Sequence, residues 1–153
     1  MKRRQLLKSG VALGAMWLGV RSGVLRLREA MAAWPRQAFE GDSVSAALQA
    51  LYGSQHTRGS DEIGIDIPDL AENGAVVPIK INTTITGVEE LCIFGDKNPV
   101  PLIARFVFST RAAPPVSTRI KLADSSNVVV AVKTAAGVFR RERWIEVSEG
   151  GCG

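Results

Sequence analysis

The chain has 153 residues, of which 46% are hydrophobic and 22% are charged, and its formal net charge is +4. This length suffices for one domain with a single hydrophobic core. A net positive charge indicates a nucleic-acid partner only where the basic residues belong to the folded domain. Seven of the 19 basic residues but one of the 15 acidic residues precede Trp34, so 12 basic and 14 acidic residues remain. The remaining formal charge of −2 removes the argument for a nucleic-acid partner.

The first 33 residues contain the parts of a twin-arginine export signal. Arg3 and Arg4 are adjacent, an apolar run occupies residues 11–20, and alanines just before position 34 offer a cleavage site. The apolar run of about ten residues is shorter than the roughly 20 residues of a membrane-spanning helix. The sequence therefore predicts a cleavable leader over 1–33, a periplasmic location reached by the twin-arginine route, and no membrane association after cleavage.

The body begins with one predicted helix, over about residues 43–52. Asp42 or Ser43 can accept a hydrogen bond from the first turn, and Gly53 is placed to end the helix. Between them four apolar residues recur at helical spacing, namely Val44, Ala47, Leu48 and Leu51. This stripe is expected to pack on the rest of the domain, and a polar loop is expected over 53–62.

The remainder of the body is predicted to be rich in β-strands. Residues 77, 79 and 81 are apolar and alternate with Pro78, Lys80 and Asn82, which is typical of antiparallel strands with one buried face. Seven such segments are separated by turn residues, at 63–67, 76–84, 88–94, 102–109, 116–123, 128–133 and 137–147. No helical crossovers separate them, which argues against a parallel α/β sheet. We expect residues 34–148 to form an all-β, immunoglobulin-like antiparallel sandwich with one N-terminal helix.

Residues 149–153 place a cysteine between glycines at the end of the sequence. Glycine has more backbone freedom than any other residue, and chain ends are seldom well ordered. Four extended residues span roughly 13–14 Å. We therefore expect Gly150, Gly151 and Gly153 to form a flexible arm that carries the thiol of Cys152 outside the folded body. Such a thiol suits entry into the active sites of other proteins.

The other candidate reactive residues are few. Cys92 falls in a predicted central strand, where it is interpreted as a small core residue, although an oxidising compartment would also allow a Cys92–Cys152 disulfide. His56 is interpreted as an exposed loop residue, since a base on a loop and a nucleophile on a mobile arm are poorly arranged for catalysis. The sequence contains neither a metal-ligand cluster nor a phosphate-binding loop. It therefore predicts a protein without metal, cofactor or catalytic residues of its own.

Four segments together resemble a known family: 71–78 (AENGAVVP), 97–102 (KNPVPL), 116–121 (VSTRIK) and 150–153 (GGCG). The chain is similar to SoxY, the sulfur-carrier subunit of the periplasmic Sox thiosulfate-oxidation system. Two features depart from the family pattern. The usual ending has a further glycine after Gly153, and Cys92 occupies a strand position where a plain apolar residue is expected.

The resemblance implies a carrier and not an enzyme. Cys152 would be the covalent attachment residue, and the three glycines around it would be the hinge of the arm. A c-type cytochrome would join thiosulfate to the cysteine, a hydrolase would release sulfate, and a sulfane dehydrogenase would oxidise the remaining sulfur. The carrier would form a heterodimer with a small β-sandwich subunit, SoxZ.

Two other classes of protein are also compatible with the sequence. A periplasmic thiol-disulfide redox protein would use both cysteines, although the sequence has no C-x-x-C motif. An immunoglobulin-like binding module would use Cys152 to cross-link two chains. Trp144 shares a predicted strand face with Arg140 and Glu142, where it would either join an interface or cover an edge of the core. The basic cluster of Arg140, Arg141 and Arg143 is interpreted as a solvated face.

Overall fold

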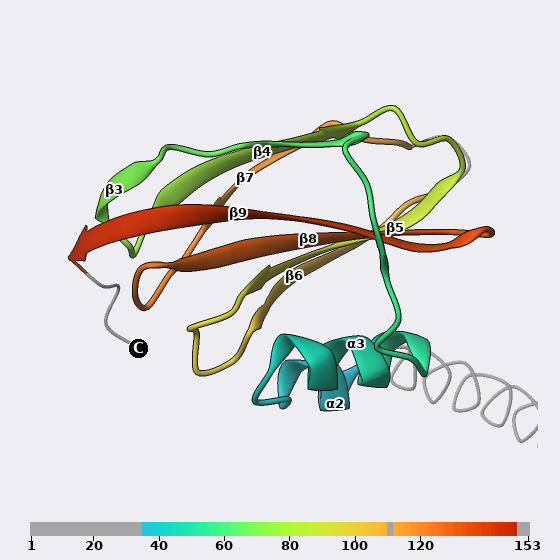
Figure 1. Ribbon diagram of the computed structural model, residues 1–153, viewed down its shortest axis with the longest axis horizontal. Coiled ribbons are helices and arrows are strands. Elements are labelled where there is room, and N and C mark those ends of the chain that lie inside the picture. The colour runs from blue at the N-terminus through green and yellow to red at the C-terminus, as the bar shows by residue number, and fades with distance from the viewer. Residues whose placement is uncertain (1–34, 110–111, 150–153) are drawn as a thin grey trace, which may run out of the picture. The chain divides into compact units, whose positions relative to one another are not determined.

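The computed structural model describes residues 35–109 and 112–149 (Figure 1). The predicted leader over 1–33, with Arg3 and Arg4, lies outside the described residues, as do Gly150, Gly151, Cys152 and Gly153. The described residues form two helices, α2 (Arg36–Phe39) and α3 (Val44–Tyr52), followed by nine strands. The strands are β1 (Arg58–Gly59), β2 (Ile63–Asp66), β3 (Leu70–Asn73), β4 (Val77–Thr83), β5 (Val88–Gly95), β6 (Leu102–Val107), β7 (Val116–Ile120), β8 (Ser126–Thr134) and β9 (Gly137–Glu149).

Helix α3 lies where the apolar spacing predicts a helix. Of the two candidate caps, the structure uses Ser43, whose Oγ accepts a hydrogen bond from the Ala46 amide at 3.2 Å. Gly53 ends the helix in the left-handed conformation, with φ of 68°, and donates to the Gln49 carbonyl at 2.9 Å. Helix α2 was not predicted because its four residues are too few to show a helical period. Neither helix of the described part is long and apolar enough to cross a membrane.

The strands form two sheets. The larger sheet has the order β1-β9-β8-β5-β6, with β3 also paired to β9, and the smaller sheet has the order β2-β4-β7. All seven predicted strands are present, with ends shifted by a few residues. The expectation of antiparallel pairing is wrong for the two additional strands, since β1 and β3 both run parallel to β9.

The short strand β1 lies inside the segment predicted as a polar loop, over 53–62. Arg58 and Gly59 pair with Phe139 and Arg140 of β9. The Arg58 guanidinium donates to the carbonyl of Ala136 in the β8–β9 turn and lies 4.9 Å from the centre of the Phe139 ring. These contacts are with residues nearly 80 positions away, so the local sequence carries no sign of the strand.

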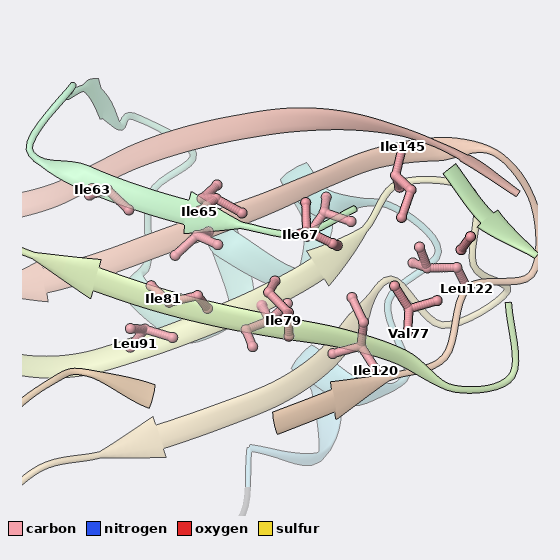
Figure 2. Close-up of a cluster of buried hydrophobic side chains, with 14 of the residues drawn as sticks. Ile63, Ile65, Ile67, Val77, Ile79, Ile81, Leu91, Ile120, Leu122 and Ile145 are labelled. Atoms are coloured by element: carbon pink, nitrogen blue, oxygen red, sulfur yellow. The ribbon is translucent and has the colours of Figure 1, made fainter. Parts of the chain in front are cut away.

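The main core lies between the two sheets (Figure 2). Alternate residues of the smaller sheet point inward from β2 and β4, as the period of two in 77–82 predicts. They meet alternate residues of β5 and β8 from the larger sheet. The fully enclosed members include Ile63, Val77, Ile81, Leu91, Ile93, Leu122, Val128, Val130, Val132 and Ile145.

A second core covers the opposite face of the larger sheet. Figure 1 shows α2 and α3 beneath this sheet, with β4 and β7 above it. The predicted stripe of α3 packs here, with Ala47 and Leu48 buried, and it meets Cys92 and Phe94 of β5. Val129 and Ala131 of β8 join the same cluster. Because β5 and β8 are covered on both faces, they read in the sequence as continuous apolar runs.

Candidate functional site

Strand β9 precedes Cys152 and is paired with a neighbouring strand up to Glu149, the last residue before Gly150, Gly151 and Cys152. Strand β9 ends at Glu149, which pairs with Asn73 of the parallel strand β3. The Glu149 carbonyl accepts a hydrogen bond from the Gly74 amide at 2.8 Å. The root of the predicted arm, defined here as residues 145–149, therefore belongs to the sheet, and Cys152 follows it by three residues.

Contacts on its other side also hold this root. Ser125 lies beside it, and its Oγ accepts from the Val147 amide at 2.9 Å and donates to the Val147 carbonyl at 3.4 Å. The side chains of Ile145 and Val147 are buried in the main core. Glu146 and Ser148 alternate with them and are exposed, as are Glu149 at the end of the strand and Glu72 on the neighbouring strand. The root is thus anchored through its apolar face and presents carboxylates to solvent.

Cys92 is a buried core residue, as its position in a central strand predicts. Its thiol is free and fully enclosed, and its sulfur lies 3.3 Å from the Tyr52 hydroxyl and 3.5 Å from Oε1 of Glu90. Burial raises the pKa of this thiol to about 12. Since the thiolate is the reactive form of cysteine, Cys92 is chemically inert at neutral pH.

Glu90 lies at the centre of a polar network that the sequence did not indicate. Its Oε2 lies 2.5 Å from Nη2 of Arg105 on the neighbouring strand β6, and its Oε1 accepts from the Tyr52 hydroxyl at 3.0 Å. The residue is 4% exposed. Burial by itself raises the pKa of this carboxyl, but hydrogen bonds from Arg105 and Tyr52 outweigh burial and hold the pKa below its ordinary value of 4.5. The one local sign was the charged residues in these two strands, which are Glu89 and Glu90 in β5 and Arg105 in β6.

This network predicts a pH-dependent contribution of Glu90 to stability. Because the pKa is lowered on folding, the contribution is complete above the unfolded pKa and declines as the pH falls through the folded pKa. We expect Glu90→Gln to lower the free energy of unfolding at pH 7 by about 1–3 kcal/mol. The deficit should shrink as the pH falls below the ordinary carboxyl pKa and through the lowered pKa of the folded state, where the wild-type carboxyl also becomes neutral. Urea unfolding at pH 7, 4 and 3 measures both effects.

The matched control is Glu89→Gln. Glu89 is the preceding residue, is exposed, and forms a looser ion pair with Lys133 at 3.7 Å. Its replacement should change stability by no more than about 0.5 kcal/mol. A Glu90→Gln deficit that is the same at every pH would contradict the assignment of a lowered pKa.

The basic cluster on β9 is more than the solvated face that its sequence indicates. Arg141 donates from Nη1 to the carbonyls of Asp61 and Ile63, at 2.9 and 2.8 Å. Arg143 donates to the Ile65 carbonyl at 3.2 Å and binds Asp69 at 2.7 Å. These two arginines join the larger sheet to strand β2 of the smaller sheet, because β2 lies directly beside β9 in the fold.

Two further residues that the sequence analysis considered, Trp144 and His56, are exposed in the structure. Trp144 is 54% exposed and shares its strand face with Arg140 and Glu142, so it does not cover the core. His56 is exposed in the segment before β1. Across residues 35–109 and 112–149 no three His, Cys, Asp or Glu side chains are grouped so that they could hold a metal ion.

Comparison with known proteins gives a match to the family model described as sulfur oxidation protein SoxY, over residues 48–152. The chain belongs to the SoxY family. A solved structure of the sulfur carrier protein SoxY from Chlorobium limicola f thiosulfatophilum is 35% identical in sequence, with a TM-score of 0.63. The similarity covers 69% of this chain and 96% of that one. No curated protein sequence matches the chain.

Membership of the SoxY family gives this chain the role of a sulfur carrier in sulfur oxidation. The shared fold is mostly β-sheet, with two small helices. The family match begins in α3 and continues through both sheets and the root to residue 152. The segment that contains the predicted attachment cysteine is therefore part of the matched family region.

Proposed function

We propose that this chain holds thiosulfate-derived intermediates covalently on Cys152 and presents them to the enzymes of the Sox pathway. The observation that carries the proposal is the hydrogen-bonded anchoring of β9 up to Glu149, within a family match that extends to residue 152. Three residues beyond an anchored strand give the thiol a reach of roughly 10 Å. Gly150, Gly151 and Gly153 leave it free of bulky neighbours.

The proposed loading step is an oxidation. The thiol of Cys152 and the outer sulfur of thiosulfate form an S–S bond, with loss of one proton and two electrons. A c-type cytochrome accepts the electrons. Glu146 and Glu149 near the arm favour the neutral thiol, so the active site of the cytochrome would supply the group that removes the proton. The product is a cysteine S-thiosulfonate.

Later steps would leave the intermediate attached to the carrier. Water cleaves the bond between the outer two sulfur atoms in a hydrolase, which releases sulfate and leaves a cysteine persulfide. A sulfane dehydrogenase would oxidise the remaining sulfur. The covalent tether keeps each small anion at a high effective concentration near the next enzyme. In this scheme the chain is not itself an enzyme, and it works in the periplasm after twin-arginine export, with a SoxZ-like subunit.

The buried position of Cys92 supports a single attachment site. A thiol with a pKa of about 12 stays protonated at neutral pH, so it does not compete for thiosulfate. The burial of Cys92 also argues against a thiol-disulfide redox protein, because a resolving cysteine must be accessible to the cysteine with which it pairs.

Intact mass measurement under non-reducing conditions tests the proposal. The full chain is incubated with thiosulfate and its cytochrome partner, and peptide mapping locates any adduct. We expect a thiosulfonate on Cys152 that mild reduction removes. A chain two hydrogens lighter, with a Cys92–Cys152 disulfide, would contradict the proposal, and so would an adduct on Cys92.

A further inference from the structure

The connection between β7 and β8 holds the root of the arm at two points. At the first, Ser125 Oγ bonds both backbone groups of Val147. At the second, the Leu122 amide donates to the carbonyl of Gly74 at 2.8 Å, and the Gly74 amide donates to the carbonyl of Glu149 at 2.8 Å. The place of Glu149, where the predicted arm begins, therefore depends on the backbone of this connection.

One side chain, that of Asn98, holds the connection in turn. Its Nδ2 donates to the Lys121 carbonyl at 2.9 Å, and its Oδ1 accepts from the Ala123 amide at 2.9 Å. The Lys121 carbonyl and the Leu122 amide belong to one peptide unit, in which C=O and N–H point in opposite directions. This unit is therefore held between Asn98 on one side and Gly74 on the other.

The turn that carries Asn98 is itself tied to the larger sheet. The Asn98 amide donates to the Gly95 carbonyl at 3.2 Å. Asp96 accepts from the backbone amide and the side-chain amide of Asn127 in β8, at 2.9 and 3.2 Å. A Cβ at position 95 would lie 3.3 Å from Cγ of Asn98 and 3.1 Å from Cδ2 of Leu122. Because Gly95 has no side chain, Asn98 can pack closely enough to reach the connection.

We propose that Asn98 is a positioning residue for Cys152, which acts through the β7–β8 connection and fixes the point where the arm leaves the body. This inference rests on the proposed function. Asn98 lies in the segment 97–102, one of the four that carry the family resemblance, and the proposed function gives this segment no role. Its two side-chain bonds give it one: they support the backbone that supports Glu149.

The length of free chain determines how often the thiol meets an enzyme that also contacts the body. With the root held, three residues lead from Glu149 to Cys152, whereas seven follow Ile145, which the main core buries. The effective concentration of a tethered group falls roughly as the −3/2 power of the chain length, so release of the root lowers it about three- to fourfold. The chemistry at sulfur is unchanged, so the effect should fall on KM and not on kcat.

The test compares Asn98→Ala with two control variants, all in the full chain. Asn98→Ala removes both bonds to the connection. Asn82→Ala is the same substitution at an exposed residue of β4, which lies outside the contacts described above. Cys92→Ala changes a buried residue of the helix-covered core and controls for a general loss of stability. Urea unfolding establishes that all three variants fold.

Amide hydrogen exchange is measured first, on unloaded chains, so that the result does not depend on sulfur chemistry. The amides of Leu122 and Val147 report on local opening of the connection and the root. We expect both to exchange about tenfold faster in Asn98→Ala, since two hydrogen bonds are lost, and at the wild-type rate in both controls. Wild-type rates in Asn98→Ala would overturn the proposal.

The second measurement uses the loaded chains as substrates of the sulfate-releasing hydrolase. We expect KM to be about three- to fourfold higher for Asn98→Ala, with kcat unchanged, and both constants to be unchanged in the controls. An equal rise in KM for Cys92→Ala would overturn the proposal and assign the effect to lost stability. Failure of the wild-type chain to load Cys152 would instead contradict the proposed function, and the exchange measurement would still decide the role of Asn98.

Ser125→Ala is the second variant, which is measured in the same way and decides the question if Asn98→Ala does not fold. It removes the direct contact between the connection and Val147 and leaves both bonds of Asn98 in place. We expect faster exchange of the Val147 amide and a raised KM with unchanged kcat. A wild-type KM in this variant, together with faster exchange at Val147, would show that the root does not position Cys152.

Discussion

The Cys152→Ser chain should lose all thiosulfate-dependent sulfate release in a reconstituted Sox system, to the level seen when the chain is omitted. A serine hydroxyl cannot form the S–S bond on which each later step depends. The change lies beyond the anchored root, so the body should keep its stability. The assay measures sulfate released and cytochrome reduced, with the intact mass of the chain recorded at the end. Full turnover by this variant would refute the proposed attachment site.

Cys92→Ala is the matched control for that experiment. It removes the other cysteine, which is fully enclosed between β5 and the helices. We expect normal loading of Cys152 and normal sulfate release, at a loss of about 1–2 kcal/mol in the free energy of unfolding from the small cavity. Loss of loading in Cys92→Ala would show that the buried thiol takes part in the chemistry.

Phe94→Ala should give the largest loss of stability among single changes in the helix-covered core. Phe94 is completely buried between the larger sheet and the helices, in the cluster that contains Leu48 and Val129. Removing a buried ring lowers the free energy of unfolding by about 3–5 kcal/mol. This is a large part of the free energy of unfolding of a typical domain, which is about 5–15 kcal/mol. Urea unfolding at pH 7, followed by far-UV circular dichroism, measures this loss.

The control for Phe94→Ala is Val76→Ala, at a position that is 55% exposed. It should change stability by no more than about 0.5 kcal/mol. At urea concentrations below its unfolding midpoint, Phe94→Ala should still load Cys152. The Phe94 ring lies in the helix-covered core, whereas Ile145 and Val147 hold the root of the arm in the main core. Equal stability of the two variants would show that the helices are not a packed layer of the domain.

The strands could be predicted because their signals are local. In β4, inward Val77, Ile79 and Ile81 alternate with exposed residues, and this period places one face on the core. Helix α3 could likewise be predicted from apolar residues at helical spacing and from Gly53 at its end. In contrast, β1 and β3 are short, and their pairing depends on β9, which lies about 70–80 residues away in the sequence. The two residues of β1 are too few for a period, and the apolar residues of β3, Leu70 and Ala71, are adjacent and do not alternate. A local pattern therefore could not show either strand.

In the candidate site, too, local motifs could be predicted from the sequence and long-range contacts could not. Gly-Gly-Cys-Gly is a local motif, so the sequence by itself determined the proposed attachment residue and the family resemblance that the match over 48–152 confirmed. The sequence also predicted that Cys92 is buried. Only the tertiary structure decided that Glu90 binds both Arg105 and Tyr52, and that Arg141 and Arg143 cover β2. The place of β6 at the end of the larger sheet, among the described strands, was likewise decided by the tertiary structure. Each of these depends on strand order and on which edges meet, and long-range packing determines both.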